Sequence, residues 1–113
     1  MIKIYHNPRC KKSREGLAIL ENSRKNFEII KYLENTVSKE ELQTVIKKLN
    51  ISPIEIVRKN EKIWKENFKG KELSENDIVN AMLAYPKLIE RPIVIYDDKA
   101  IIGRPPETIK DFI

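Results

Sequence analysis

Cysteine and histidine are almost absent from this chain. Its 113 residues include one cysteine, Cys10, and one histidine, His6. A single cysteine cannot form an internal disulfide, and one cysteine with one histidine cannot supply a common structural zinc site. The sequence therefore predicts no structural zinc site, and we expect no other bound metal ion and no bound organic cofactor.

Long apolar runs and glycine-rich segments are also missing. No run approaches the roughly 20 residues of a membrane-spanning helix, and residues 1–6 lack the apolar segment of a secretory signal. The three glycines form no phosphate-binding or dinucleotide-binding pattern. We therefore expect a small, soluble, cytoplasmic protein that has no membrane partner.

The charge is moderately basic and well mixed. Lys and Arg number 22 against 17 Asp and Glu, which gives a formal net charge of +5, and apolar residues make up 41% of the chain. This composition supports one core and argues against disorder. Because acidic residues accompany most basic ones, we expect a mixed-charge surface and no nucleic-acid partner. Only residues 9–14 are locally basic without an acid, and they surround the only thiol.

The order of apolar patterns and turn signals predicts an α/β fold. Strands are expected at 2–5, 27–33, 93–96 and 100–103, and helices at about 11–26, 38–50, 52–58, 74–86 and 105–112. A β-α-β start favours parallel pairing, and a closing hairpin adds antiparallel pairs. The sequence therefore predicts one thioredoxin-like domain over residues 1–113, with a four-stranded mixed sheet and a helical insertion at roughly 52–85.

Cys10 is expected at the turn from the first strand to the first helix. Helix N-termini carry partial positive charge and unpaired amides, which favour an anion. Neighbouring basic side chains, and His6 across the turn, would also favour thiolate over thiol. The alternative, a buried and inert cysteine, is less favoured because its sequence neighbours are charged.

Ser13 and His6 each allow two interpretations. Ser13 follows Cys10 by three residues, so its hydroxyl could stabilise the thiolate or could satisfy local backbone groups. His6 could act as a base or orient the loop, or it could be a structural histidine. Since there is no second thiol, any redox cycle must use a thiol from another molecule.

Two arginines precede prolines, which favours extended backbone at Arg91 and Arg104 beside the ends of the closing strands. In a thioredoxin-like sheet, the turn before the third strand faces the thiol. Together with Arg58, three guanidinium groups would suit a tetrahedral oxyanion. A phosphatase loop of the Cys-x5-Arg type is excluded, because position 16 is glycine.

Several sequence blocks together resemble the glutaredoxin-coupled arsenate reductase (ArsC) family. They are Tyr5-His-Asn-Pro-x-Cys10-x-x-Ser13-Arg14, Tyr32-Leu-Glu34, Val57-Arg58-Lys-Asn60, Leu88-Ile-x-Arg91-Pro-Ile-Val94 and Gly103-Arg104-Pro. They follow the family order across almost the whole chain. The resemblance implies a thioredoxin-like fold with a helical insertion, and a proline in the cis form at Pro92.

The resemblance also implies an activity and roles for individual residues. Cys10 matches the nucleophile of arsenate reduction, and His6 and Ser13 match positions that tune its thiolate. The three oxyanion-binding arginines correspond to Arg58, Arg91 and Arg104. Arsenate or a related oxyanion would be the substrate, glutathione a cosubstrate and glutaredoxin a partner.

Two other functions stay open. The same family includes short ArsC-like proteins and Spx, a regulator that binds RNA polymerase. Spx typically carries Cys-x-x-Cys in this loop, and Ser13 departs from that pattern. A glutathione-dependent thiol oxidoreductase that does not act on arsenate is the other alternative. The end of the chain at Ile113, earlier than in longer arsenate reductases, is a further departure from the family pattern.

Overall fold

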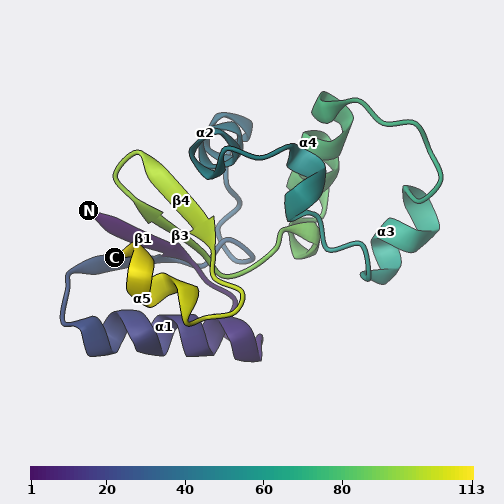
Figure 1. Ribbon diagram of the computed structural model, residues 1–113. Coiled ribbons are helices and arrows are strands. Elements are labelled where there is room, and N and C mark those ends of the chain that lie inside the picture. The colour runs from purple at the N-terminus through teal and green to yellow at the C-terminus, as the bar shows by residue number, and fades with distance from the viewer. The chain divides into compact units, whose positions relative to one another are not determined.

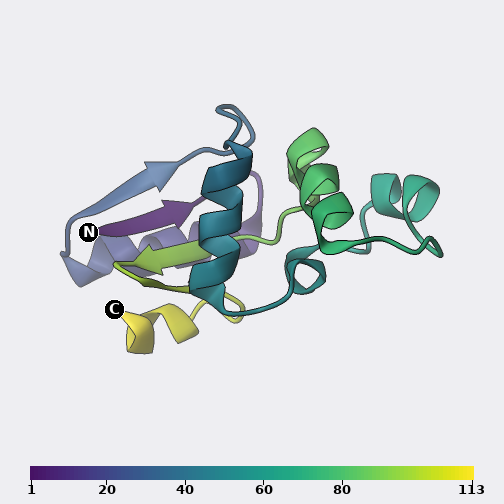
Figure 2. The same cartoon turned by 90° about the horizontal axis from the view of Figure 1, so that it is seen from above.

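The alternating start of the chain forms the first strand of a mixed sheet. In the computed structural model, which describes residues 1–113, β1 (Ile2–Tyr5) pairs in parallel with β2 (Phe27–Ile30). On its other side β1 pairs antiparallel with β3 (Ile93–Tyr96), and β3 pairs antiparallel with β4 (Lys99–Ile102). The strand order is therefore β2-β1-β3-β4 (Figures 1 and 2). This confirms the predicted α/β fold with a four-stranded mixed sheet.

The chain divides into two compact units. The first contains Met1–Asn35 and Arg91–Ile113, including the whole sheet, and the second is Thr36–Glu90. The assignment of the chain to one domain with an insertion at about 52–85 stays a prediction. None of the helices has the length and apolar character needed to cross a membrane.

Two helices cover one face of the sheet in the first unit. They are α1 (Lys11–Ser23) and α5 (Thr108–Phe112), which lie on the same side of the strands (Figure 1). Alternation along β1 points Ile2 and Ile4 toward them. The resulting core consists of Ile2, Ile4, Leu20, Val94 and Ile109, all at most 3% exposed. Helix α1, which follows the only thiol, is therefore fixed to the sheet through the buried contacts of Leu20.

Close packing at one end of this core depends on two glycines. A Cβ atom on Gly16 would lie 2.9 Å from Pro92 Cγ, and one on Gly103 would lie 2.8 Å from Ile109 Cδ1. The Arg91–Pro92 peptide bond is cis, as the family resemblance implied, and the Arg104–Pro105 bond is also cis. These glycines let α1 and the segment after β4 approach the proline closely.

The second unit is helical. It contains α2 (Lys39–Leu49), α3 (Lys62–Asn67) and α4 (Glu75–Ala84), with short 3-10 turns η1 (Pro53–Ile56) and η2 (Pro86–Leu88). The predicted start signals define α2 and α4, because Ser38 and Ser74 accept hydrogen bonds from the amides three residues later. The apolar faces of α2 and α4 are buried.

The helices differ from the sequence prediction at three places. The helix expected over 52–58 is only the 3-10 turn η1, because the chain extends at Val57 and pairs with Ile89. The last helix starts at Thr108, three residues after the predicted start. The helix α3 was not predicted, because its sequence is short and rich in charge. Packing stabilises it, since Trp64 is buried and stacks on Phe68 with ring centroids 5.3 Å apart.

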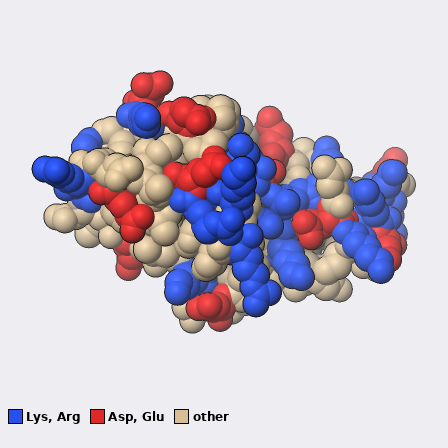
Figure 3. Space-filling view, turned by 90° about the horizontal axis from the view of Figure 1, so that it is seen from below, with Lys and Arg blue, Asp and Glu red and all other residues tan.

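The surface carries both signs of charge, in keeping with the composition. Figure 3 shows one face on which Lys and Arg side chains lie among Asp and Glu side chains. The ion pairs at the surface include Lys12 with Glu15 at 3.8 Å and Lys62 with Glu66 at 3.7 Å. Exposed pairs of this kind contribute little to stability.

Candidate active site

Cys10 lies at the N-cap of α1, immediately after the turn that follows β1. Its backbone is extended, with φ −93° and ψ 123°. The Asn7-Pro8 turn places it there: the Cys10 amide donates to the Asn7 carbonyl at 3.0 Å, and the Arg9 amide donates to Asn7 Oδ1 at 3.0 Å. The first turn of α1 contains no acidic residue. The thiol is therefore held beside the positive end of a helix of 13 residues.

Ser13 is the buried centre of a small polar network behind this turn. Its hydroxyl oxygen accepts a hydrogen bond from the Asn7 amide at 3.0 Å and lies 2.7 Å from His6 Nδ1. Both His6 and Ser13 are buried, at 4% and 0% exposure. The hydroxyl thus satisfies local groups, which is one of the two interpretations that the sequence left open.

His6 contributes an imidazole ring to this network. Burial is the main cause that holds the pKa of His6 below its usual value, and the positive charge of Lys31 lowers it further. A hydrogen bond with the Ser13 backbone raises the pKa and so acts in the opposite direction. Burial therefore favours the uncharged form of the imidazole, which contacts the loop through Ser13 Oγ at 2.7 Å.

Arg104 lies beside the thiol. Its Nη2 donates to Cys10 Sγ at 3.4 Å, and its Nε donates to the backbone carbonyl of Arg91 at 2.8 Å. The amide of Gly103 donates to the Pro92 carbonyl at 2.8 Å, which fixes the segment that carries Arg104 against the start of β3. The closing hairpin thus brings a guanidinium group to the sulfur from a position 94 residues away in the sequence.

The surroundings of Cys10 favour its thiolate. Partial burial raises the pKa of the thiol, but the Ser13 amide, the Arg91 guanidinium and the Lys12 amide lower it, and the net result is a pKa below the ordinary value. Lowered thiol pKa values are typical of reactive cysteines at helix N-termini beside cations. The first unit therefore brings together Cys10, Arg91 and Arg104, with His6 and Ser13 behind the loop.

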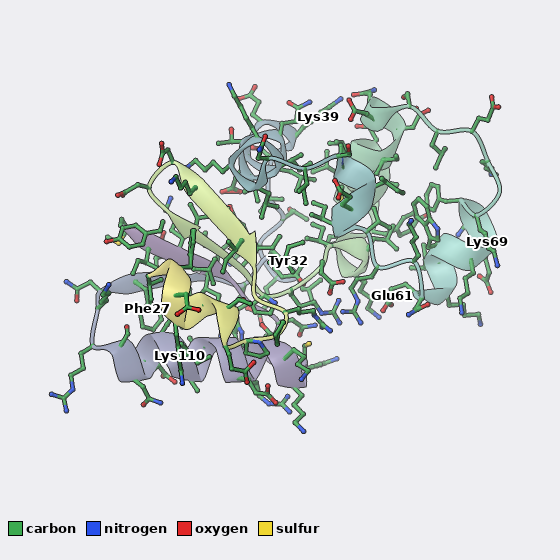
Figure 4. The ribbon with its side chains drawn as sticks, in the orientation of Figure 1. Phe27, Tyr32, Lys39, Glu61, Lys69 and Lys110 are labelled. Carbon is green, nitrogen blue, oxygen red and sulfur yellow. The ribbon has the colours of Figure 1, made fainter.

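Arg58, the third predicted arginine, belongs to the second unit, where two carboxylates hold it. Its Nη1 lies 3.0 Å from Glu90 Oε1, and its Nε lies 3.4 Å from Glu61 Oε2. Glu61 directly precedes α3 (Figure 4). The role of Arg58 in oxyanion binding stays a prediction from the family resemblance, as do the catalytic roles of the other five residues.

The sequence of this chain matches that of a known family over almost its full length. The profile of the ArsC family covers residues 5–112. The chain belongs to the ArsC family.

Relatives in the ArsC family cover nearly the same length. An arsenate reductase of Haemophilus influenzae is 45% identical over 97% of this chain and 97% of its own. A protein of Escherichia coli called YfgD, whose function is uncharacterised, is 43% identical over 99% of this chain and 96% of its own. The solved structure of an arsenate reductase from Vibrio cholerae has a TM-score of 0.93 and 43% identity, and the match covers 99% of this chain and 97% of that one.

Three residues that contact the predicted site residues within their own units were missed by the sequence analysis. Asn7 builds the turn before the thiol, and only its position before Pro8 indicated that role. Glu61 and Glu90 hold Arg58, and the spacing of three between Arg58 and Glu61 was the one available signal. No cluster of three or more His, Cys, Asp and Glu side chains is placed to hold a metal ion, and the expected lack of a bound cofactor stays a prediction.

Proposed function

We propose that this protein reduces arsenate to arsenite, with Cys10 as the nucleophile. The observation that carries the proposal is the thiol itself: Cys10 Sγ lies at the N-terminus of α1, 3.4 Å from Arg104 Nη2, and its pKa is lowered. A thiolate beside guanidinium groups is suited to attack an oxyanion that those same groups neutralise. Support comes also from ArsC family relatives that carry the name arsenate reductase.

The arginines have distinct tasks in this proposal. Arg91 and Arg104 would bind arsenate oxygens beside the sulfur, because the planar fork of a guanidinium matches two oxygens of a tetrahedral anion. Arg58 would bind a further oxygen, a role taken from the family resemblance. As the thiolate attacks arsenic, an arsenic–sulfur bond forms and an oxygen leaves as water after protonation.

Two electrons are needed to convert arsenate to arsenite, and two thiols supply them by forming a disulfide. Cys10 is the only thiol of the chain. The second must come from another molecule, for which we propose glutathione. The resulting mixed disulfide on Cys10 would then be reduced by glutaredoxin, which regenerates the thiolate.

The test is arsenate-dependent NADPH oxidation coupled through glutathione, glutathione reductase and glutaredoxin, beside a thioredoxin-coupled assay. Turnover that disappears in Cys10→Ser would support the proposal and identify the donor. Folded protein with a titratable thiol and no turnover with either donor would contradict arsenate as the substrate. Disulfide exchange with glutathione mixed disulfides that ignores arsenate would favour the thiol oxidoreductase instead.

Replacement of Arg91 by lysine separates charge from geometry. Arg91→Lys keeps the positive charge but loses the planar fork, so we expect kcat/KM for arsenate to fall by about tenfold or more. Arg9→Lys is the matched control, because Arg9 is an exposed neighbour of Cys10 with no guanidinium contact to the sulfur. Full activity in Arg91→Lys would contradict the proposed fork contact.

A further inference from the structure

The backbone of the second unit places two carboxylates on Arg58. The segments around Val57 and Ile89 form an antiparallel bridge, in which the Arg58 amide donates to the Leu88 carbonyl at 2.7 Å and the Glu90 amide donates to the Ile56 carbonyl at 2.8 Å. This register makes Arg58 and Glu90 diagonal neighbours, within reach of long side chains. The contact at 3.0 Å between Arg58 Nη1 and Glu90 Oε1 follows from it.

The second carboxylate comes from the next turn of chain. The Glu61 amide donates to the Arg58 carbonyl at 3.1 Å, which folds residues 58–61 into a turn and brings Glu61 Oε2 to 3.4 Å from Arg58 Nε. The side chains of Arg58, Glu61 and Glu90 are only 23%, 29% and 23% exposed. Solvent therefore screens this cluster less than it screens an ordinary surface ion pair.

Such an arrangement changes what Arg58 can bind. Each carboxylate attracts the guanidinium and repels any anion that approaches it, and the repulsion grows in proportion to the charge of that anion. Arg58 keeps further N–H donors, since a guanidinium has five and these contacts occupy Nε and one position of Nη1. It can therefore still donate to an oxyanion oxygen, but with a penalty for each negative charge.

We infer that Glu61 and Glu90 are specificity-determining residues, which lower the affinity of Arg58 for doubly charged oxyanions relative to singly charged ones. This rests on the proposed function, because it takes Arg58 to be part of the oxyanion site. The form of arsenate that the protein binds best is then the monoanion, which carries one proton more than the dianion. A dianion of the same shape, such as sulfate, binds weakly as long as both carboxylates are charged.

The test measures anion binding without turnover. Sulfate and nitrate, a dianion and a monoanion, are titrated calorimetrically into the reduced protein and its variants. Glu90→Gln and Glu61→Gln each remove a negative charge but keep an amide oxygen that can accept from Arg58. We expect each variant to bind sulfate about fivefold and nitrate about twofold more tightly than the parent protein. The gain is smaller for nitrate, because a carboxylate repels a monoanion with half the energy with which it repels a dianion.

Glu66→Gln is the matched control. Glu66 lies on α3, is 57% exposed and pairs with Lys62 at 3.7 Å, so its replacement changes the net charge equally without touching Arg58. Sulfate binding should stay unchanged in this variant. Circular dichroism and urea unfolding of every variant confirm that differences in affinity do not come from unfolding.

Each outcome decides the inference. Unchanged or weaker sulfate binding in both Glu90→Gln and Glu61→Gln would overturn it, because the carboxylates would then only position Arg58. Unchanged sulfate binding in Arg58→Gln would overturn it as well. If the carboxylate variants gain sulfate affinity as expected but the protein does not reduce arsenate, the proposed function fails while the charge selectivity stands.

Discussion

Loss of the Arg104 side chain should raise the pKa of Cys10. Arg104 Nη2 donates to Cys10 Sγ at 3.4 Å. A positive charge at this distance stabilises the thiolate and leaves the neutral thiol almost unaffected. In Arg104→Gln the charge is removed while a side chain of similar polarity remains, so the thiolate becomes less stable and the titration of the thiol moves to higher pH.

The size of the effect follows from the distance. Unit charges 3.4 Å apart interact with about 1.2 kcal/mol in water and about 4.9 kcal/mol at an effective dielectric constant of about 20. Arg104 is exposed, so the lower figure applies. It corresponds to an about eightfold smaller thiolate population at any pH well below the pKa.

The assay is a pH titration of thiolate absorbance in the ultraviolet, with the rate of iodoacetamide alkylation beside it. Alkylation should slow by only about threefold, because a thiolate of higher pKa is the stronger nucleophile. Arg9→Gln is the control, since it removes the same charge next to Cys10 in the sequence without the contact to Sγ. Its titration should shift less than that of Arg104→Gln.

Two results would refute this reasoning. An unchanged titration in Arg104→Gln would mean that the contact at 3.4 Å does not stabilise the thiolate. Equal shifts in Arg104→Gln and Arg9→Gln would mean that Arg104 lowers the pKa of Cys10 through the general positive potential of the loop and not through its direct contact with Sγ. High salt would then abolish both shifts.

Two further predictions concern stability. Gly103→Ala should lower the free energy of unfolding by about 1–3 kcal/mol, because its Cβ would lie 2.8 Å from Ile109 Cδ1 and 2.9 Å from Pro92 Cγ; a urea midpoint equal to that of the parent would show that these side chains move aside freely. Ser74→Ala should lower the free energy of unfolding by about 1 kcal/mol, because the Ser74 hydroxyl accepts a hydrogen bond from the Asp77 amide at 3.1 Å. The same urea titration measures it, and no loss would contradict a stabilising cap.

Local patterns accounted for much of the fold. The alternation in β1, the caps before α2 and α4 and the presence of the closing hairpin are set by residues close together in sequence. The hairpin turn is one residue shorter than predicted, because β4 starts at Lys99. These signals depend on side-chain periodicity and backbone preference, which act over a few residues. The predicted mixed sheet is also confirmed, although the pairing of β1 with β3 joins strands from opposite ends of the chain.

Local patterns failed where stability comes from contacts made elsewhere in the chain. The six residues of α3 have weak helical signals, and the helix forms because Trp64 packs on Phe68, which itself meets Tyr85. The expected strand at 27–33 ends at Ile30. Tertiary packing overrides local propensity in short segments, because each residue contributes only a fraction of a kcal/mol to the local preference.

The sequence by itself determined the chemistry available to this protein: one thiol at a strand-to-helix turn, basic residues around it and arginines before two prolines. The tertiary structure decided how those groups act. It placed the Arg104 guanidinium beside the sulfur from 94 residues away, lowered the pKa of His6 by burying it and placed two carboxylates against Arg58. The physical reason is that electrostatic effects depend on distance and burial, which arise only when remote segments pack together.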